Sequence, residues 1–220
     1  MAGLDPPEDA PAVALFPQFE SDLYQMVSTE VQGLTDAQLD FESDRWEWSK
    51  WSIRRNLSHL AFGDFRWLVD RWGPVLFPQG PSDIEDLDAI INSGYDRRLD
   101  EERYWEAETI LAVVRRGLAL CQSVLAGETV GTARSKEIKL DDSGNWPQYD
   151  QAHPRGIRWG PDDPSPVYIT LEATLRHRYY EYMTHLYNIQ RLKRAQGLAA
   201  AVAVPRVGYW VVDGWDRSEP

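Results

Sequence analysis

The sequence has 220 residues and a mass of 25.3 kDa, which suits one large domain or two small ones, and we expect one. Hydrophobic residues make up 43% and charged residues 26%, a composition that excludes collagen-like and disordered chains. The net charge of −12 repels nucleic-acid phosphates and anionic lipids, so we expect neither nucleic acid nor a membrane as a partner.

The N-terminal segment, residues 1–15, is acidic and rich in proline, and we expect it to be a flexible tail. It lacks the basic start and apolar centre of a signal peptide. The longest uninterrupted apolar run, residues 198–204, is much shorter than the ~20 residues that cross a bilayer. The single cysteine, Cys121, cannot form an internal disulfide. We therefore expect a cytoplasmic protein with one domain over residues 16–220.

Two amphipathic helices are predicted in the first third of the chain. Residues 16–34 carry apolar side chains at steps of three and four residues, which is the spacing of one helix face. Thr35 and Gln38 then form the pattern of a capping box that begins a single turn. A second helix, capped by Ser49 or Ser52, follows and ends before a Gly-Pro pair.

Two further helices are predicted in the second half of the chain, over about residues 100–125 and 165–196. Each carries its apolar residues on one face. In the last helix the spacing between successive apolar residues alternates between four and three positions. This spacing is typical of a helix packed in a bundle at a shallow angle. Four amphipathic helices together predict an all-α domain built as a four-helix bundle.

The connections between these helices are less regular. Residues 73–100 contain several prolines and a patchy apolar stretch, and we expect a crossover connection with a short helix inside it. Residues 128–166 have no long periodic run, and we expect a long loop, which is usually functional or disordered. Over residues 202–212 apolar residues alternate only loosely with other residues. This pattern fits either a short strand or an extended tail over the bundle.

Two of the four histidines lie beside the apolar face of a predicted core helix. His59 is on the second helix, and His185 is on the fourth, with Glu181 one turn before it. Residues four apart are neighbours on a helix surface, so Glu181 and His185 can reach one point in space. Such a pair is more often solvated than functional, and a histidine in this position is more often a hydrogen-bonded boundary residue than a ligand.

Asp64 lies near the centre of the apolar face of the second helix. A buried carboxylate requires a partner. Two alternatives are open: an ion pair with an arginine of another helix, or a hydrogen bond that orients a ligand histidine.

The stretch WSIRRNLSHL, residues 51–60, followed by Asp64, resembles the second-helix signature of the DinB/YfiT-like family of metalloenzymes. Residues 34–39 resemble the turn after that family's first helix, and residues 185–189 resemble the segment that supplies its last ligand. The resemblance covers roughly residues 16–196. We therefore expect an all-α fold, a four-helix bundle of DinB/YfiT-like type with long crossover loops and a short extended C-terminal tail.

In that family a divalent metal, often zinc or nickel, is held by one histidine of the second helix and a His-x-x-x-His pair on the last. His59 and His185 match two of these positions, and Glu181 occupies the third. Zinc accepts carboxylate ligands, and two histidines with one carboxylate also suit ferrous iron. The resemblance thus implies a zinc or nickel site at His59, Glu181 and His185, and the ligand types also allow iron. His177, which lies one turn before Glu181, is the spare candidate. The alternative is a site that has lost its metal, in which Glu181 hydrogen-bonds with a histidine.

The resemblance implies a metal-dependent enzyme of thiol-transferase or hydrolase type that acts on a small molecule, together with a low-molecular-weight thiol. A divalent ion lowers the pKa of bound water to about 7 and ionises a bound thiol. Asp64 is then the expected catalytic residue, because it would orient His59 or take a proton. The alternative function is a non-catalytic module that binds a small ligand or an interaction partner. Either protein could form a homodimer through the faces of its bundle.

The segment 128–166 carries a local basic and aromatic patch that includes Arg155, Arg158 and Trp159. Such a patch suits an anionic small molecule, and we expect these three residues to bind a substrate or cofactor. The alternative is that the two arginines pair with nearby acids, such as Asp150, Asp162 and Asp163.

Overall fold

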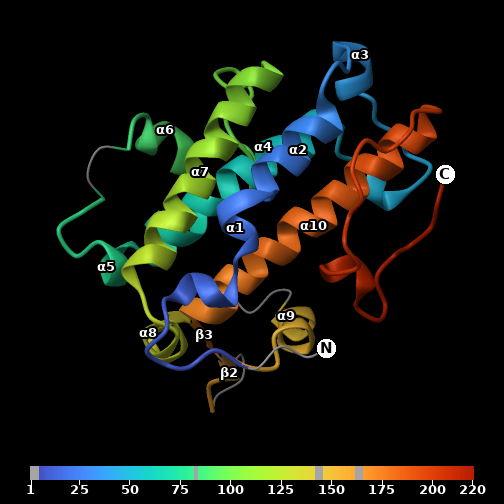
Figure 1. Ribbon diagram of the computed structural model, residues 1–220. Coiled ribbons are helices and arrows are strands. Elements are labelled where there is room, and N and C mark those ends of the chain that lie inside the picture. The colour runs from blue at the N-terminus through green and yellow to red at the C-terminus, as the bar shows by residue number, and fades with distance from the viewer. Residues whose placement is uncertain (1–4, 82–83, 142–145, 162–165) are drawn as a thin grey trace.

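The computed structural model describes residues 5–81, 84–141, 146–161 and 166–220. Most of its ordered elements are helices, and four of these pack side by side (Figure 1): α2 (Leu23–Val31), α4 (Ile53–Phe65), α7 (Ala107–Gly127) and α10 (Leu171–Ala195). Helices α2 and α4 each contact both α7 and α10. The prediction of a mostly helical domain is therefore confirmed.

Side chains at the predicted positions cap the helices. The Ser52 hydroxyl accepts a hydrogen bond from the backbone N–H three residues later at 3.2 Å, so Ser52 rather than Ser49 caps α4. Thr35 and Gln38 form the predicted capping box at the start of the short helix α3 (Asp36–Leu39).

Three of the predicted helices are shorter than expected. The last one, α10, begins at Leu171 rather than near residue 165, because the strand β3 (Val167–Thr170) precedes it. The segment 16–34 is divided at Asp22 into α1 (Gln18–Ser21) and α2. Helix α7 begins at residue 107 rather than near residue 100, because a tight turn precedes it. In this turn the Tyr104 N–H donates a hydrogen bond to the Asp100 carbonyl at 2.8 Å.

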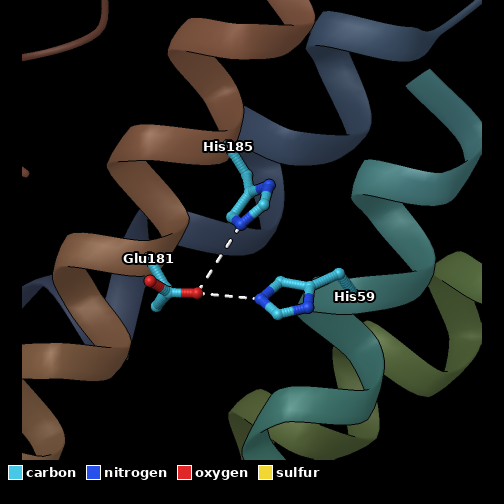
Figure 2. A group of neighbouring side chains, drawn as sticks. All are labelled: His59, Glu181 and His185. Carbon is cyan, nitrogen blue, oxygen red and sulfur yellow. Dashed lines mark hydrogen bonds and ion pairs between the residues drawn. The ribbon is translucent and has the colours of Figure 1, made fainter. Parts of the chain in front are cut away.

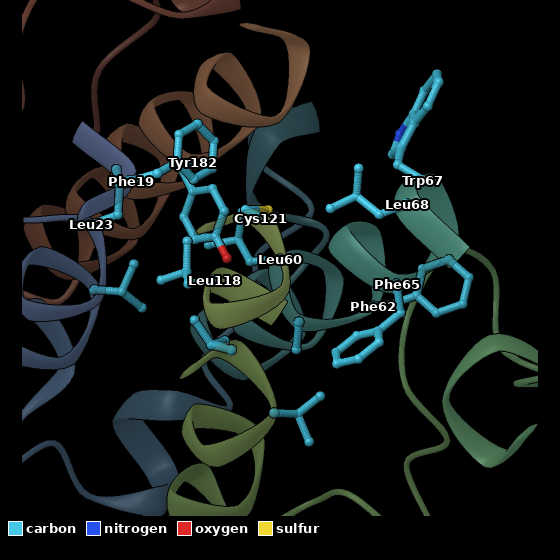
Figure 3. Packing of buried hydrophobic residues seen from close by; sticks show 14 of the residues in the cluster. Phe19, Leu23, Leu60, Phe62, Phe65, Trp67, Leu68, Leu118, Cys121 and Tyr182 are labelled. Atoms are coloured by element: carbon cyan, nitrogen blue, oxygen red, sulfur yellow. The ribbon is translucent and has the colours of Figure 1, made fainter. Parts of the chain in front are cut away.

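Apolar side chains from these helices meet in one core, shown in Figure 3. Full burial of one leucine or phenylalanine stabilises the fold by roughly 1.5–3 kcal/mol. The core thus fixes α4 against α10, which positions the side chains discussed below. Its central members are Phe19 from α1, Leu23 from α2, Leu60 from α4, Leu118 and Cys121 from α7, and Tyr182 from α10.

Helix α7 is long and apolar enough to cross a membrane, judged by length and composition alone. Half of its most apolar stretch is buried inside the protein. Core helices of soluble proteins meet the same criteria, so this property of α7 is weak support for a membrane span.

A small sheet replaces the long loop expected over residues 128–166, and the expectation of a purely helical fold is wrong in this region. The sheet is antiparallel with strand order β1-β3-β2, and it lies at one end of the helices (Figure 1). Strands of three or four residues are too short to show a clear alternation in the sequence. The elements are α8 (Val130–Ser135), β1 (Glu137–Leu140), α9 (Trp146–Ala152), β2 (Ile157–Trp159) and β3 (Val167–Thr170).

The described part of the crossover segment, residues 73–81 and 84–100, contains two short helices, α5 (Gly73–Leu76) and α6 (Leu87–Ile91), where one was expected. The described part of the segment 1–15, for which we expected a flexible tail, lies against α8. Ala12 is fully buried at the start of the 3₁₀ turn η1 (Ala12–Leu15), and its N–H donates to the Glu128 carbonyl at 2.9 Å.

The C-terminal segment, residues 197–220, is fully described and runs back along α10 as an extended tail without a strand. Buried Glu30 of α2 accepts hydrogen bonds from the backbone N–H groups of Ala201 and Val202 at 3.0 to 3.1 Å. The 3₁₀ turn η4 (Tyr209–Val211) then packs on α10. This path brings the tail to the wall of the cleft described next.

Candidate metal centre

The structure brings the three predicted ligands together, as Figure 2 shows. His59 extends from α4, and Glu181 and His185 extend from successive turns of α10. Glu181 Oε2 lies 2.8 Å from His59 Nε2 and 3.6 Å from His185 Nε2. One ligand atom from each residue lies within 4.8 Å of the other two. Helix packing thus brings His59 next to Glu181 and His185, although 122 residues separate His59 from Glu181 in the sequence.

A backbone carbonyl fixes the orientation and tautomer of His59. His59 Nδ1 lies 2.8 Å from the carbonyl oxygen of Arg97. A carbonyl only accepts hydrogen bonds, so Nδ1 carries a hydrogen. When the ring is neutral, Nε2 has a lone pair, and its 2.8 Å contact with ionised Glu181 then requires a proton or a metal cation between the two atoms. Arg97 has a φ of +53°, a conformation that is uncommon for a residue other than glycine and often occurs at functional sites.

An asparagine does the same for His185. His185 Nδ1 lies 2.6 Å from Oδ1 of Asn56. The Asn56 amide nitrogen donates to the carbonyls of Trp51 and Ser52, so the amide oxygen must face the imidazole. His185 Nδ1 is therefore also a donor, and Nε2 is left with its lone pair. Metal-binding histidines usually have such a partner on the other ring nitrogen.

The pKa values of Glu181 and His185 are both lowered, but for different reasons. Burial opposes ionisation of Glu181, but the polar contacts with His185 and His59 outweigh it and hold the pKa of Glu181 well below its usual range. Burial, together with repulsion from His59, lowers the pKa of His185 to about 4. At neutral pH the cluster therefore presents an ionised carboxylate beside the neutral imidazole of His185, an arrangement that attracts a cation.

The three residues line a cleft of about 830 Å³, called the His59 cleft below. This volume lies within the range of small-molecule sites. The Trp51 ring stacks on His185, with centroids 6.3 Å apart, and lies 5.3 Å from the His59 ring. Other aromatic side chains of the wall include Trp67, Tyr149, Tyr209 and Trp215.

Asp64 forms the ion pair that was one of its two predicted roles. It is fully buried, and Oδ1 accepts a hydrogen bond from Nε of Arg178 at 2.8 Å. Oδ2 accepts another from the Tyr182 hydroxyl at 2.7 Å. The expectation that Asp64 orients His59 is wrong, because the Arg97 carbonyl occupies that position.

His177, the spare candidate, lines the cleft but belongs to a different hydrogen-bonded group. Its Nδ1 lies 2.7 Å from the Tyr209 hydroxyl, which also lies 2.8 Å from Nε2 of His153. Burial lowers the pKa of both histidines, that of His153 to about 3. The C-terminal tail thus supplies a hydroxyl between two buried, neutral imidazoles.

The residues Arg155, Arg158 and Trp159 are not part of the His59 cleft. Arg158 binds both carboxylate oxygens of Glu137 at 2.6 and 2.9 Å, and Arg155 lies 3.3 Å from Asp5. Trp159 Nε1 lies 3.5 Å from the carboxylate of Asp150. Both arginines thus pair with acids, as the alternative predicted, but their partners are not the acids that were named there. Asp162 and Asp163 lie outside the described residues.

Sequence reasoning missed Asn56 and the Arg97 carbonyl. Asn56 lies three residues before His59 and on the same side of α4, so its spacing could have drawn attention to it. A backbone carbonyl leaves no such signal in the sequence, because every residue has one.

Comparison with known proteins identifies no relative: no family model, no curated protein and no solved structure matches this chain. Functional inference therefore depends on the side chains of the His59 cleft. The arrangement of His59, Glu181 and His185, each held by α4 or α10, is its most specific chemical feature.

Proposed function

We propose that this protein is a divalent-metal-dependent enzyme of thiol-transferase or hydrolase type, in which His59, Glu181 and His185 hold the ion. One observation carries the proposal. Two imidazole Nε2 atoms and a carboxylate oxygen converge, while both Nδ1 atoms donate to fixed acceptors. This donor set suits zinc, and it also suits nickel or ferrous iron.

The chain's own groups would divide the work of such a site. The Arg97 carbonyl and the Asn56 amide hold the two imidazoles in place, so little reorganisation accompanies binding. Three protein ligands leave a further coordination position, and a divalent ion would there lower the pKa of water or a thiol into the neutral range. The aromatic wall would hold the small substrate, and a low-molecular-weight thiol is the co-substrate that we propose.

We also propose that α2, α4, α7 and α10 form a four-helix bundle of DinB/YfiT-like type. In support, these four helices pack in a closed ring of contacts. The candidate ligands lie on the second and last of them, at the positions where that family carries its metal.

The second candidate is a non-catalytic module that binds a small ligand without metal. One distance favours it: His59 Nε2 and Glu181 Oε2 are 2.8 Å apart, which is a hydrogen-bond length. Two ligands of a tetrahedral zinc ion, each about 2.0 to 2.2 Å from the metal, would be about 3.3 Å apart. In this alternative a shared proton takes the place of the ion.

Elemental analysis of protein purified without a chelator or a histidine tag distinguishes the two candidates. We expect one equivalent of zinc, nickel or iron in the wild type, and its loss in His59→Ala and in His185→Ala. His153→Gln is the matched control, because His153 is buried outside the His59 cleft and should leave the metal content unchanged. A wild type that stays metal-free after incubation with all three ions contradicts the metalloenzyme proposal.

A further inference from the structure

A hydrogen-bonded chain of three side chains ends at the His59 cleft. It runs from His153, directly after α9, through Tyr209 of the C-terminal tail to His177 of α10. All three side chains are buried, and two of them, Tyr209 and His177, border the cleft. The chain thus leads from the protein interior to the cleft.

One ring nitrogen of His177 is left for a ligand. Nδ1 contacts the Tyr209 hydroxyl at 2.7 Å, whereas Nε2 has no hydrogen-bond partner among the described residues. The side chain is only 2% exposed, and leaving a buried polar atom unpartnered costs roughly 1–3 kcal/mol. Nε2 is not among the unpartnered atoms that are sealed from solvent, and the open space that His177 borders is the cleft. A ligand in the cleft can therefore supply the missing partner.

The hydroxyl of Tyr209 decides which nitrogen of His177 carries the hydrogen. It has one hydrogen and two imidazole neighbours, so it donates to one ring and accepts from the other. His153 Nδ1 is enclosed and has no partner within the described chain. Orphaned donors are rarer in protein interiors than orphaned acceptors, so the His153 hydrogen lies on Nε2, which donates to Tyr209. The hydroxyl then donates to His177 Nδ1, and the hydrogen of His177 lies on Nε2.

The surroundings keep the His177 ring neutral and hold it in place. Burial lowers the pKa of His177 well below its usual range, so the ring is uncharged at neutral pH. The rings of Trp67 and Tyr149 each make a T-shaped contact with it, with centroids 4.8 Å away. Trp67 belongs to the π-helical segment η3 (Arg66–Arg71), a rare kind of turn that occurs frequently at functional sites. His177 therefore offers the cleft one fixed, neutral N–H donor between aromatic rings.

We infer that the His59 cleft binds a small molecule with an uncharged carbonyl group, whose oxygen accepts a hydrogen bond from Nε2 of His177. A neutral imidazole that donates in this way polarises a carbonyl group. Glu181 lies one turn of α10 after His177, about 6 Å along the helix axis, which is within the length of a small molecule. The inference rests on the proposed function, since it names the substrate class of that site: a carbonyl compound that a thiol or water attacks. Tyr209 and His153 are then positioning residues.

Two probes that differ only at the carbonyl group test the inference on the full-length protein. Acetophenone carries a carbonyl beside a benzene ring, and ethylbenzene has a methylene group in its place. Saturation-transfer NMR measures both affinities in protein stripped with a chelator. We expect acetophenone to bind the wild type. In His177→Phe the ratio of acetophenone to ethylbenzene affinity should fall about fivefold, the loss of one neutral hydrogen bond. The ratio cancels the effect of the changed ring on cleft shape.

The hydrogen positions are measured separately, from the ring nitrogen signals of protein labelled with ¹⁵N-histidine. We expect a neutral His177 with its hydrogen on Nε2, and acetophenone should shift the Nε2 signal. Tyr209→Phe removes the donor to Nδ1, so the Nδ1 signal should move and the tautomer with its hydrogen on Nδ1 should appear. Tyr180→Phe is the matched control and should leave these signals unchanged. Tyr180 packs on the rings of His153 and Tyr209 but does not border the cleft.

Any of three results overturns the inference: a wild type that does not bind acetophenone, a His177→Phe variant with an unchanged affinity ratio, or a wild-type His177 that carries its hydrogen on Nδ1. The first and third are measured on the wild type, so they do not depend on whether a variant folds. All samples are metal-free, so failure of this inference is distinct from a failure to bind metal, which elemental analysis reports.

Discussion

The Nε2 atom of His59 lies 2.8 Å from Oε2 of Glu181, although 122 residues separate them in the chain. His59 extends from α4 and Glu181 from α10 (Figure 2), so the contact requires these two helices to pack together. An unfolded chain has no comparable cluster. A metal ion that binds these residues would therefore favour the folded state, and its affinity would be coupled to folding.

The first prediction follows from this coupling. Zinc at 100 times its dissociation constant should raise the free energy of unfolding by about 2.7 kcal/mol. The increase should disappear in His59→Gln and persist in His153→Gln, which keeps the cluster intact. Urea denaturation of stripped protein, with and without zinc, measures it. Equal stabilisation of wild type and His59→Gln would mean that zinc binds elsewhere.

The helices and two of the candidate ligands could be predicted because their signals are local. The Ser52 cap of α4 and the spacing of Glu181 and His185 each lie within a few residues. The resemblance of residues 51–60 to a known second-helix signature identified His59 as a further candidate ligand. These signals required no knowledge of which helices touch.

The remaining features depend on tertiary packing. Asp64 and Arg178 are 114 residues apart, and the sequence could not choose between an ion pair and a hydrogen bond to His59. Tyr209 reaches His153 and His177 only because the tail returns along α10. The short strands were missed because strands of three and four residues offer too little alternation.

The second prediction concerns the buried ion pair of Asp64 and Arg178. Asp64→Ala leaves the Arg178 guanidinium buried without its counter-charge, and we expect a loss of about 3–5 kcal/mol in the free energy of unfolding. The double variant Asp64→Leu with Arg178→Met should lose less than Asp64→Ala alone, since no charge then remains buried. Urea denaturation of stripped protein measures the free energies of unfolding of the wild type and both variants. A loss below about 1 kcal/mol for Asp64→Ala would contradict the structural role.

The third prediction tests the space that this ion pair requires. A Cβ atom added at Gly63 would lie 2.6 Å from Cζ of Arg178, too close for a non-bonded contact. Gly63→Ala should therefore destabilise the protein, although alanine favours a helix over glycine by about 1 kcal/mol. Gly127→Ala is the control, because nothing lies within 4 Å of its added Cβ. Thermal unfolding should show a lower midpoint for Gly63→Ala only, and equal midpoints would show that Arg178 can move aside.

The fourth prediction concerns pH and His153. His153 is fully buried, and burial lowers its pKa to about 3, whereas the unfolded chain binds this proton with a pKa near 6.5. Between pH 7 and pH 5 the unfolded state therefore takes up a proton that the folded state does not, so stability falls as the pH falls. The contribution is complete above about pH 6.5 and decreases down to about pH 3.

For this one histidine, the loss between pH 7 and pH 5 is about 2 kcal/mol. His153→Gln should lower the overall stability, because the Tyr209 hydroxyl loses a partner, but its decrease between pH 7 and pH 5 should be about 2 kcal/mol smaller than in the wild type. Urea denaturation of metal-free protein at both pH values gives the two differences. His185 titrates in both proteins, so its effect cancels in the comparison. An equal decrease in variant and wild type would show that His153 takes up its proton in the folded state as readily as in the unfolded chain.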